Sequence, residues 1–458
     1  MKKLLILALF SMLTGHSVPA QEAAPSVLEP PKEEAVQPAD AAVPALPPPP
    51  PTAGDKWREV LGRTAGREGW KRTPGEGLVV DADILDEAIE ASRSYYLSAQ
   101  LPEGNFLYGL DITNNEPDSS DNQVRQAGAL WGLSNLNRER FNEPTRRAVL
   151  LGLDFFMHNM RQPPAGFPRV ITYKGGKIIK TGTVALFCLA LTDFLEGQER
   201  YLPESQRTLY MKALETNLKF LQAMELPEGG WREEFNATAA LDGNLCPTSS
   251  PYYDGEALLA YLCALRFYNA RPNLTAPEGL EKRVETAIPL LIQKYVVDAL
   301  LPGGNSELTK GFCQWGMMSF ALFEAYHEGE TADAAADAAT TLAWWQIFTN
   351  MVEYRTGNTA YAVEGLLGAW HVAKHRGHTE DANFLRKNIL RILSNLLLCQ
   401  IGGPFGDKNP YLTYWKPHMA ARTYGGIISS QNYGYIRIDN VQHQMHAMLL
   451  ARKLLFEE

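Results

Sequence analysis

Acidic residues stand at or just inside the starts of segments that are otherwise small and apolar: Asp121, Asp254, Glu256, Glu364 and Asp439. The helix dipole stabilises a carboxylate in a first helical turn, so capping alone could account for several of them. If these helix starts converge on one cavity, the carboxylates could also work in pairs, one as acid and one as base. Glu256, flanked by tyrosines that exclude water, is then the predicted acid. Asp121 or Asp439 is the predicted base.

Polar and aromatic side chains accompany these acids. Arg125 lies one turn into an apolar segment, where a charge is costly unless it is paired. It could hold a carboxylate or sulfate group of a ligand, or pair with Asp121 four residues earlier. Trp315 could stack on a sugar ring or fill the core. The predicted substrate-binding residues are Asn122, Arg125, Tyr253, Asp254, Gln314, Trp315, Tyr361, Glu364, Gln442 and His443.

Asp439, His443 and His446 fall on one face of a helix, at spacings of four and three residues. This spacing could hold a zinc ion, or it could orient His443 against Asp439 as a general base. We favour the second arrangement and predict neither a metal ion nor a cofactor.

Apolar residues recur with the 3.6-residue period of a helix in twelve segments. The even-numbered segments are small, apolar and poor in charge, as in GTVALFCLAL and GEALLAYLCAL, so we expect them to be covered on most sides. The odd-numbered segments carry the charges. Strand-like alternation is short and local, as at residues 170–173. The segments are residues 81–99, 121–136, 144–160, 180–196, 205–224, 254–269, 277–294, 311–327, 333–353, 358–376, 379–400 and 437–456.

Turns that combine glycine with an aromatic residue precede several even-numbered segments, as at residues 102–106 and 227–231. Glycine permits the positive φ that such turns require. Helices that alternate between an outer and an inner layer, with long loops at one end, describe a ring. We therefore predict an all-α fold, an (α/α)6 toroid of six outer/inner helix pairs, with short β-turns or hairpins at one end. An open α-solenoid is the alternative, although it requires more uniform repeat lengths.

The architecture and the motifs at the helix starts make residues 80–458 resemble the (α/α)6-toroid carbohydrate-active proteins, which include glycoside hydrolases, polysaccharide lyases and sugar epimerases. Two inner-helix motifs also resemble those of a group of bacterial toroid proteins: NQVRQAG at residues 122–128 and YYDGEALL at residues 252–259. The PEGGW turn is similar to those of terpene cyclases and prenyltransferases. The sequence lacks their DxDD motif and a clear zinc-ligand set, so isoprenoid chemistry is disfavoured.

The resemblance implies an enzyme that acts on a glycan. Glycoside hydrolysis needs two carboxylates, about 5 Å apart for retention or roughly 6.5–9.5 Å apart for inversion. We predict a glycoside hydrolase that uses Glu256 with Asp121 or Asp439. A polysaccharide lyase on the same fold is one alternative, with His443 or Tyr361 as base and Arg125 and Asn122 against the substrate carboxylate. A non-catalytic protein that binds glycan or peptidoglycan in the cell envelope is the other.

The N-terminal region predicts export. Lys2 and Lys3 precede an apolar stretch of about ten residues that ends near Leu13, and Val18-Pro19-Ala20 suits a signal peptidase. Residues 1–20 are therefore a predicted signal peptide, with no lipoprotein cysteine after it. Residues 21–53, rich in proline and alanine, are a predicted disordered linker. Residues 54–458 form the predicted toroid domain, located in the periplasm or outside the cell.

Composition narrows the class of partner. The net charge of −9 and the pI of about 5.6 argue against nucleic acid, whose binding proteins carry basic patches. No later segment has the unbroken apolar length of a membrane span, and we expect a monomer. The five cysteines are an odd number without CxxC spacing, which favours buried free thiols over a disulfide framework.

Overall fold

The structure is a computed structural model that describes residues 75–163, 166–237, 245–301 and 303–457. The predicted signal peptide and linker lie outside these residues, so both stay predictions. Among the described helices, none is both long and apolar enough to cross a membrane.

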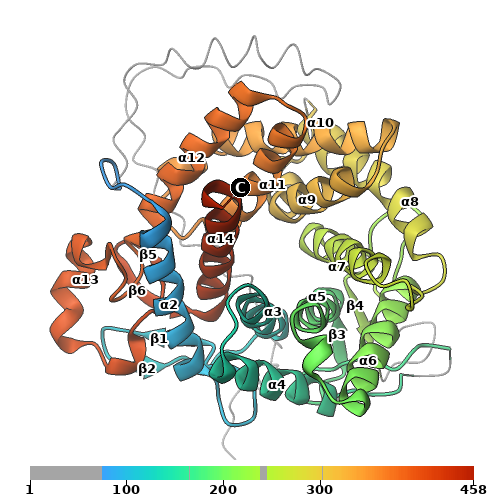
Figure 1. The fold of residues 1–458 in the computed structure, drawn as a ribbon, viewed down its shortest axis with the longest axis horizontal. Helices are drawn as coiled ribbons and strands as arrows, with labels where there is room; N and C mark the ends of the chain where they lie inside the picture. The colour runs from blue at the N-terminus through green and yellow to red at the C-terminus, as the bar shows by residue number, and fades with distance from the viewer. Residues whose placement is uncertain (1–74, 164–165, 238–244, 302, 458) are drawn as a thin grey trace, which may run out of the picture. The chain divides into compact units, whose positions relative to one another are not determined.

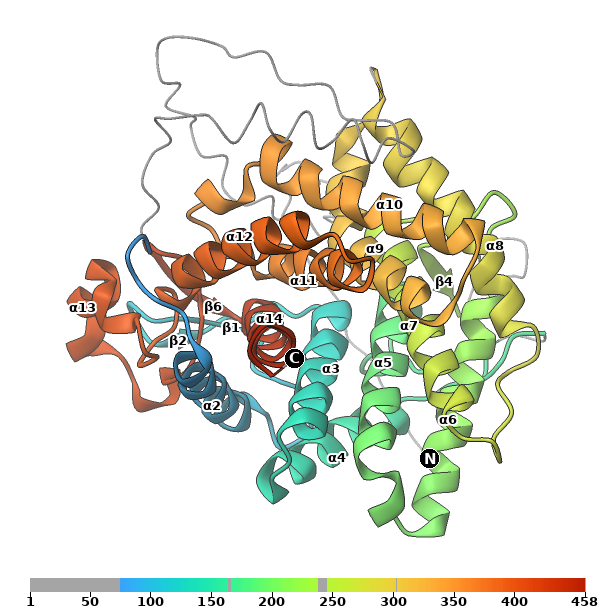
Figure 2. The ribbon, with the colours of Figure 1, turned by 45° about the horizontal axis from the view of Figure 1, so that its top comes forward.

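The described residues form two concentric layers of helices (Figures 1 and 2). The outer helices are α2 (Ala82–Ala99), α4 (Glu143–His158), α6 (Glu204–Ala223), α8 (Leu280–Ile292), α10 (Glu330–Trp344) and α12 (Thr379–Leu397). The inner helices are α3 (Gln123–Glu139), α5 (Thr181–Gln198), α7 (Pro251–Asn269), α9 (Ser306–Tyr326), α11 (Ala360–His375) and α14 (Ile438–Phe456). Each inner helix packs against the next, and α14 packs against α3. The predicted (α/α)6 toroid is confirmed, because an open solenoid would leave α14 and α3 apart.

Composition explains the two layers. In α5 every residue from Thr181 to Leu195 is buried, because neighbouring inner helices and α6 cover all its sides. Outer helix α12 instead buries one stripe, which includes Leu385, Ile389 and Ile392, and leaves its charged residues to solvent. A single apolar stripe is what a helix covered on one side requires.

Helix ends differ from the prediction where capping or a change of helix type intervenes. Helix α9 begins at Ser306 rather than at 311, because the Asn305 side chain accepts the backbone N–H of Glu307. Helices α8 and α10 end earlier than predicted, since each passes into a π-helical turn, Gln293–Asp298 and Trp345–Thr349 respectively.

A four-stranded antiparallel sheet joins the beginning of the described chain to its end. Its strands lie in the order β2 (Glu116–Pro117), β1 (Gly109–Asp111), β6 (Tyr433–Arg437) and β5 (Ile428–Ser430). Gly109 pairs with Arg437, so the loop before α3 is fastened to the strand that leads into α14. A second pair consists of β3 (Ile178–Lys180) and β4 (Glu234–Asn236). The expected alternation at 170–173 is not a strand; Val170 only forms an isolated bridge with Arg161.

Short helices complete the connections, and the cysteines contribute to packing. The short elements are η1 (Glu199–Tyr201), η5 (Val352–Tyr354), η6 (Gly406–Lys408), α13 (Pro410–Trp415), η7 (Lys416–His418) and η8 (Ala421–Thr423). All five cysteines are described and are free, and four of them are buried. This confirms the prediction of buried thiols for all but Cys246, which is partly exposed.

Candidate active site at the starts of the inner helices

The starts of the inner helices contact one another around the ring. Arg125 on α3 forms an ion pair with Asp439 on α14, with 3.1 Å between Nε and Oδ2. Gln314 on α9 donates to Glu364 on α11 at 3.3 Å. Glu364 in turn binds His443 on α14 at 2.8 Å. Helices α3 and α11 are therefore linked directly to α14, and α9 joins them through Glu364. Gln314 lies in the third turn of α9, because that helix begins earlier than predicted.

The remaining helices continue the same circle. The hydroxyl of Thr183 on α5 donates to the Gln123 side chain of α3 at 3.1 Å. Gly182 on α5 makes room for Glu256 on α7, since a Cβ at Gly182 would lie 2.3 Å from the Glu256 carboxylate. We call this end of the ring the mouth, formed by residues 122–126, 180–183, 252–256, 314–315, 361–364 and 437–446.

Glu364 anchors the mouth. Its side chain has no exposed surface, and its two oxygens accept hydrogen bonds from Nδ1 of His443 and Nδ1 of His446, each at 2.8 Å. Gln314 adds a third donor. A buried carboxylate is strongly destabilising unless it is paired and hydrogen-bonded. The two histidines and Gln314 supply this pairing for Glu364.

These contacts set the charge of the cluster. Burial would raise the pKa of Glu364, but the two histidines hold it below its usual value. Burial would lower the pKa of His443, but the carboxylates of Glu364 and Asp439 raise it above its usual value. The His443 side chain is 19% exposed, and among the described residues only its Nδ1 is bonded. Its Nε2 is therefore the ring nitrogen available to a ligand.

Asp439 is held by two arginines. Arg437 binds both carboxylate oxygens, one of them at 2.9 Å, and Arg125 approaches from α3. Burial would raise the pKa of Asp439, but Arg437 and Arg125 keep it below its usual value. Arg125 also donates to the hydroxyl of Tyr108. This network favours the charged form of Asp439 and places the partly exposed guanidinium of Arg125 at the edge of the mouth.

Two sequence-based pairings are corrected by this geometry. Arg125 does not pair with Asp121, and Asp439 is not the hydrogen-bond partner of His443. The helical spacing places Asp439 and His443 on one face, but the first turn of α14 meets α3 and the next turn meets α11. Each side chain therefore finds its partner across a helix–helix contact: Asp439 binds Arg125, and His443 binds Glu364.

Glu256 is the least compensated acid of the mouth. The residue is 4% exposed, and its Oε2 has no hydrogen-bond partner among the described residues. Burial raises the pKa of its carboxyl well above the usual value. Tyr253, half-buried, lies against the same Gly182 surface. A protonated carboxyl of this kind can donate a proton to a bound ligand.

The aromatic residues differ in exposure. Trp315 is only 3% exposed and lies over Gly255, with its ring 5.7 Å from that of Trp131 and 6.1 Å from that of His443. Trp315 therefore packs beside His443 as a buried side chain and is not exposed to solvent. Tyr361, at the start of α11, is partly exposed, and burial raises the pKa of its hydroxyl.

Asp121 and Asn122 have local structural partners. The Asp121 carboxylate accepts from Lys174 at 2.6 Å and from Tyr173 at 2.7 Å, both in the loop before α5. Asn122, not Asp121, caps α3, because its side-chain oxygen accepts two backbone N–H groups of the first turn. The structure thus gives Asp121 no contact with Glu256 or Asp439.

Two other predicted residues are buried in packing contacts. The carboxylate of Asp254 accepts from the backbone N–H of Trp231 at 2.7 Å, from Tyr295 at 2.6 Å and from Lys294 at 3.2 Å. Asp254 therefore ties the PEGGW turn and the π-helical turn after α8 to α7. Gln442 is 2% exposed and packs on α3.

Sequence reasoning left Tyr108, Arg437 and His446 out of the site. Tyr108 lies in a loop and carried no signal of its own. Arg437 stands two residues before Asp439, a spacing that could have suggested the ion pair. His446 was noted for a zinc ion, but it binds Glu364. Within the described ranges, no group of three or more His, Cys, Asp or Glu side chains is arranged to hold a metal ion.

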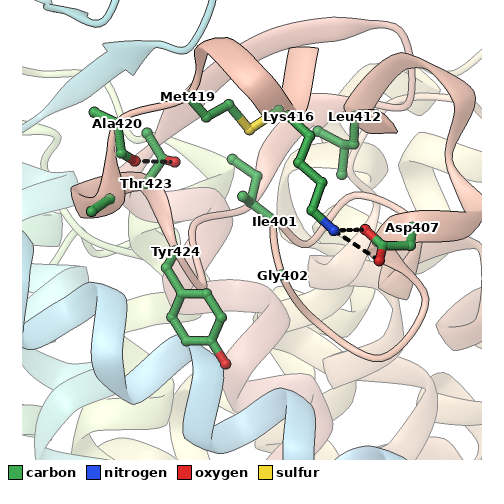
Figure 3. Close-up of a pocket in the computed structure, with 11 residues that line it drawn as sticks. Ile401, Gly402, Asp407, Leu412, Lys416, Met419, Ala420, Thr423 and Tyr424 are labelled. Carbon is green, nitrogen blue, oxygen red and sulfur yellow. Dashed lines mark hydrogen bonds and ion pairs between the residues drawn. The ribbon is translucent and has the colours of Figure 1, made fainter. Parts of the chain in front are cut away.

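A small pocket lies apart from the mouth (Figure 3). It has a volume of about 150 Å³, and apolar side chains such as Ile401, Leu412 and Met419 line it. The ion pair between Lys416 and Asp407, at 2.8 Å, closes one side. The pocket contains no residue of the mouth, so we assign it no part in the candidate site.

Comparison with known proteins finds similar folds but no similar sequences. Neither protein-family models nor curated proteins match the sequence. The structure is similar to D-mannose isomerase, at 14% identity and a TM-score of 0.54, covering 83% of this chain and 99% of that one. The structure is also similar to cellobiose 2-epimerase from Spirochaeta thermophila, at 14% identity and a TM-score of 0.51, covering 89% of this chain and 100% of that one.

The structure of a hydrolase is also similar to that of this chain. An unsaturated glucuronyl hydrolase specific for heparin matches at 9% identity and a TM-score of 0.52, covering 81% of this chain and 98% of the other. These likenesses extend over nearly the whole of each compared chain. They show that this chain has the (α/α)6 toroid fold.

Proposed function

We propose that this protein is an exported carbohydrate-active enzyme that moves a proton at a sugar carbon next to the carbonyl group, as in epimerisation or isomerisation. The observation that carries the proposal is His443. Its Nδ1 is fixed by the buried Glu364, and its Nε2 is left for a ligand at the mouth. A carboxylate that orients an imidazole through one nitrogen makes the other nitrogen an effective general base and acid.

The chemistry needs few further groups. On an open-chain aldose, Nε2 of neutral His443 would take the proton from carbon 2, leaving an enediolate. The Arg125 guanidinium, already at the mouth, would stabilise the negative oxygen. The proton on Nε2 exchanges with solvent before it is returned. Returned to carbon 2 after the planar enediolate has turned its other face to His443, it gives the epimer. Returned to carbon 1, while the proton of the carbon-2 hydroxyl passes to the carbon-1 oxygen, it gives the ketose. No oxidant or reductant is needed, since the sugar is only rearranged.

The fold likenesses support a sugar substrate. D-mannose isomerase and cellobiose 2-epimerase both rearrange sugars without adding water, and both are similar to this chain over nearly their full length. A toroid hosts many reactions, so the fold likeness only favours a sugar substrate and does not select the reaction. The choice of proton transfer rests on His443.

A second candidate, glycoside hydrolysis, has its own supporting observation. Burial raises the pKa of Glu256, whereas Arg437 and Arg125 keep the pKa of Asp439 low. Two carboxyl groups shifted in opposite directions suit an acid and a base. In this reading Glu256 protonates the leaving oxygen and Asp439 activates water.

The test is to incubate the protein with D-mannose, D-glucose, cellobiose and a heparin-derived unsaturated disaccharide in deuterated water. NMR and mass spectrometry would follow the products. We expect one deuterium at carbon 2 of an epimer or at carbon 1 of a ketose, formed at a rate that falls about 10²–10⁴-fold in His443→Gln. His378→Gln removes an exposed histidine and should leave the rate unchanged.

Other outcomes are equally informative. Cleaved products that persist in His443→Gln but vanish in Glu256→Gln would replace proton transfer with hydrolysis. Sugar binding without deuterium exchange or cleavage in the wild type would leave a non-catalytic glycan-binding protein.

A further inference from the structure

Strand β6 presents two tyrosines and an arginine on one face. Its residues alternate in burial, with Gly434 and Ile436 buried and Tyr433, Tyr435 and Arg437 reaching solvent to differing degrees. Tyr433 is 57% exposed. Since alternate residues of a strand share a face, the three side chains form a row that runs toward the start of α14.

The Tyr435 ring lies flat across the neighbouring strand. A Cβ at Gly109 of β1 would lie 2.0 Å from the Tyr435 hydroxyl oxygen, so only glycine leaves room for the ring there. The hydroxyl donates to Asp118, which fixes the ring in this position. The Tyr433 ring is 6.2 Å away, with its plane tilted by 33°. We call these two rings the tyrosine track.

The track is continuous with the mouth. Arg437, at the end of the row, binds Asp439, and Asp439 also binds Arg125. Beyond Asp439 along α14 comes His443. Strand β6 thus extends the candidate site outward, because Tyr433, Tyr435 and Arg437 form a continuous row of side chains that could contact a ligand.

Resting on the proposed function, we propose that the tyrosine track binds the sugar units of an oligosaccharide that lie beyond its reacting end. The reacting unit would sit at His443, and the following units would stack on Tyr435 and Tyr433. A tyrosine face is apolar with a polar edge, which matches the C–H face and hydroxyl rim of a pyranose. An exposed ring next to a partly exposed one suits a chain of such units better than a single monosaccharide.

The experiment compares equilibrium binding of mono- and oligosaccharides by calorimetry. The probes are glucose, cellobiose and cellotetraose, with mannose and mannotetraose as a second series. We expect the wild type to bind one tetrasaccharide at least tenfold tighter than its monosaccharide. Tyr433→Ala should weaken that tetrasaccharide about tenfold, a loss of about 1.4 kcal/mol. Tyr433→Phe keeps the ring and should retain the affinity.

The control is Tyr326→Ala, which removes a tyrosine of similar exposure, 64%, from the far end of α9 and should change nothing. Equal tetrasaccharide affinity in wild type and Tyr433→Ala would overturn the proposal, as would a wild type that binds no tetrasaccharide more tightly than the monosaccharide. Binding requires no turnover, so tight tetrasaccharide binding without deuterium exchange would reject the proposed reaction and keep the track.

Discussion

The two ends of the inner helices both carry buried charges, but they pair them differently. At the end opposite the mouth, which we call the floor (Arg138, Asp193, Glu196 and Arg266), Arg138 binds Asp193 and Glu196. Arg266 binds both oxygens of Glu196, at 3.0 and 2.9 Å. The indole N–H of Trp131 adds a hydrogen bond to Asp193 at 2.9 Å.

The mouth leaves groups incompletely paired. One oxygen of Glu256 has no partner within the described chain, His443 is bonded through a single ring nitrogen, and the Arg125 side chain is 28% exposed. Buried charges that neutralise one another fasten helices together, whereas unpaired polar groups are costly unless a ligand completes them. The comparison therefore assigns stability to the floor and chemistry to the mouth.

The largest expected effect is the loss of activity in Glu364→Gln. The amide still fills the space but removes the charge that orients His443 and holds its proton, so we expect turnover to fall about 10³–10⁴-fold, as when the orienting carboxylate of a catalytic triad is neutralised. The measurement is deuterium exchange into the rearranged sugar, with circular dichroism to verify folding.

The matched control for this variant is Glu324→Gln. Glu324 is also a buried acid of an inner helix, and it binds His375 and Arg376. It lies near the C-terminal end of α9, which is the end opposite the mouth. Its loss should lower stability and leave turnover per folded molecule within about twofold. A comparable loss of turnover in both variants would end the functional distinction between the two ends.

Next in size is the destabilisation expected for Asp193→Ala. Its side chain is 4% exposed, and its removal leaves Arg138 and the Trp131 N–H short of their central partner. Breaking a buried ion pair costs about 3–5 kcal/mol, so we expect the free energy of unfolding to fall by roughly 3 kcal/mol. Urea titration measures this directly. Unchanged stability together with lost turnover would place the floor in the catalytic machinery.

The sequence predicted the two layers of helices and included Glu364 in the candidate site, and physical reasons explain why. Helical periodicity extends over many residues, so even a weak preference at each position accumulates into a clear pattern. An isolated acid in an apolar helix is costly, so Glu364 stands out in the sequence as a residue that needs a partner or a function. Neither inference required knowledge of how one helix is rotated against another.

What the sequence could not predict depends on that rotation and on distant pairing. The strands β1 and β6 are three and five residues long and come from opposite ends of the domain, so no local period marks them. The partners of Asp439 and His443 lie on different neighbouring helices, although their spacing suggested a direct pair. Tyr435 lies near the site only because the sheet places β6 beside β1.

The smallest effect concerns Glu256 and the pH dependence of stability. Burial raises its folded pKa well above the unfolded value of about 4.5. The folded state therefore binds more protons than the unfolded state above that pH, and stability falls as pH rises toward the folded pKa. Each pH unit in this interval costs about 1.4 kcal/mol. In Glu256→Gln the slope should disappear, so that the variant gains stability relative to wild type from pH 4.5 upward in urea titrations. Glu103→Gln removes the same charge from an exposed turn and should keep the wild-type slope. A wild-type slope in Glu256→Gln would mean that the mouth, like the floor, already provides the partners that stabilise its charged carboxylate.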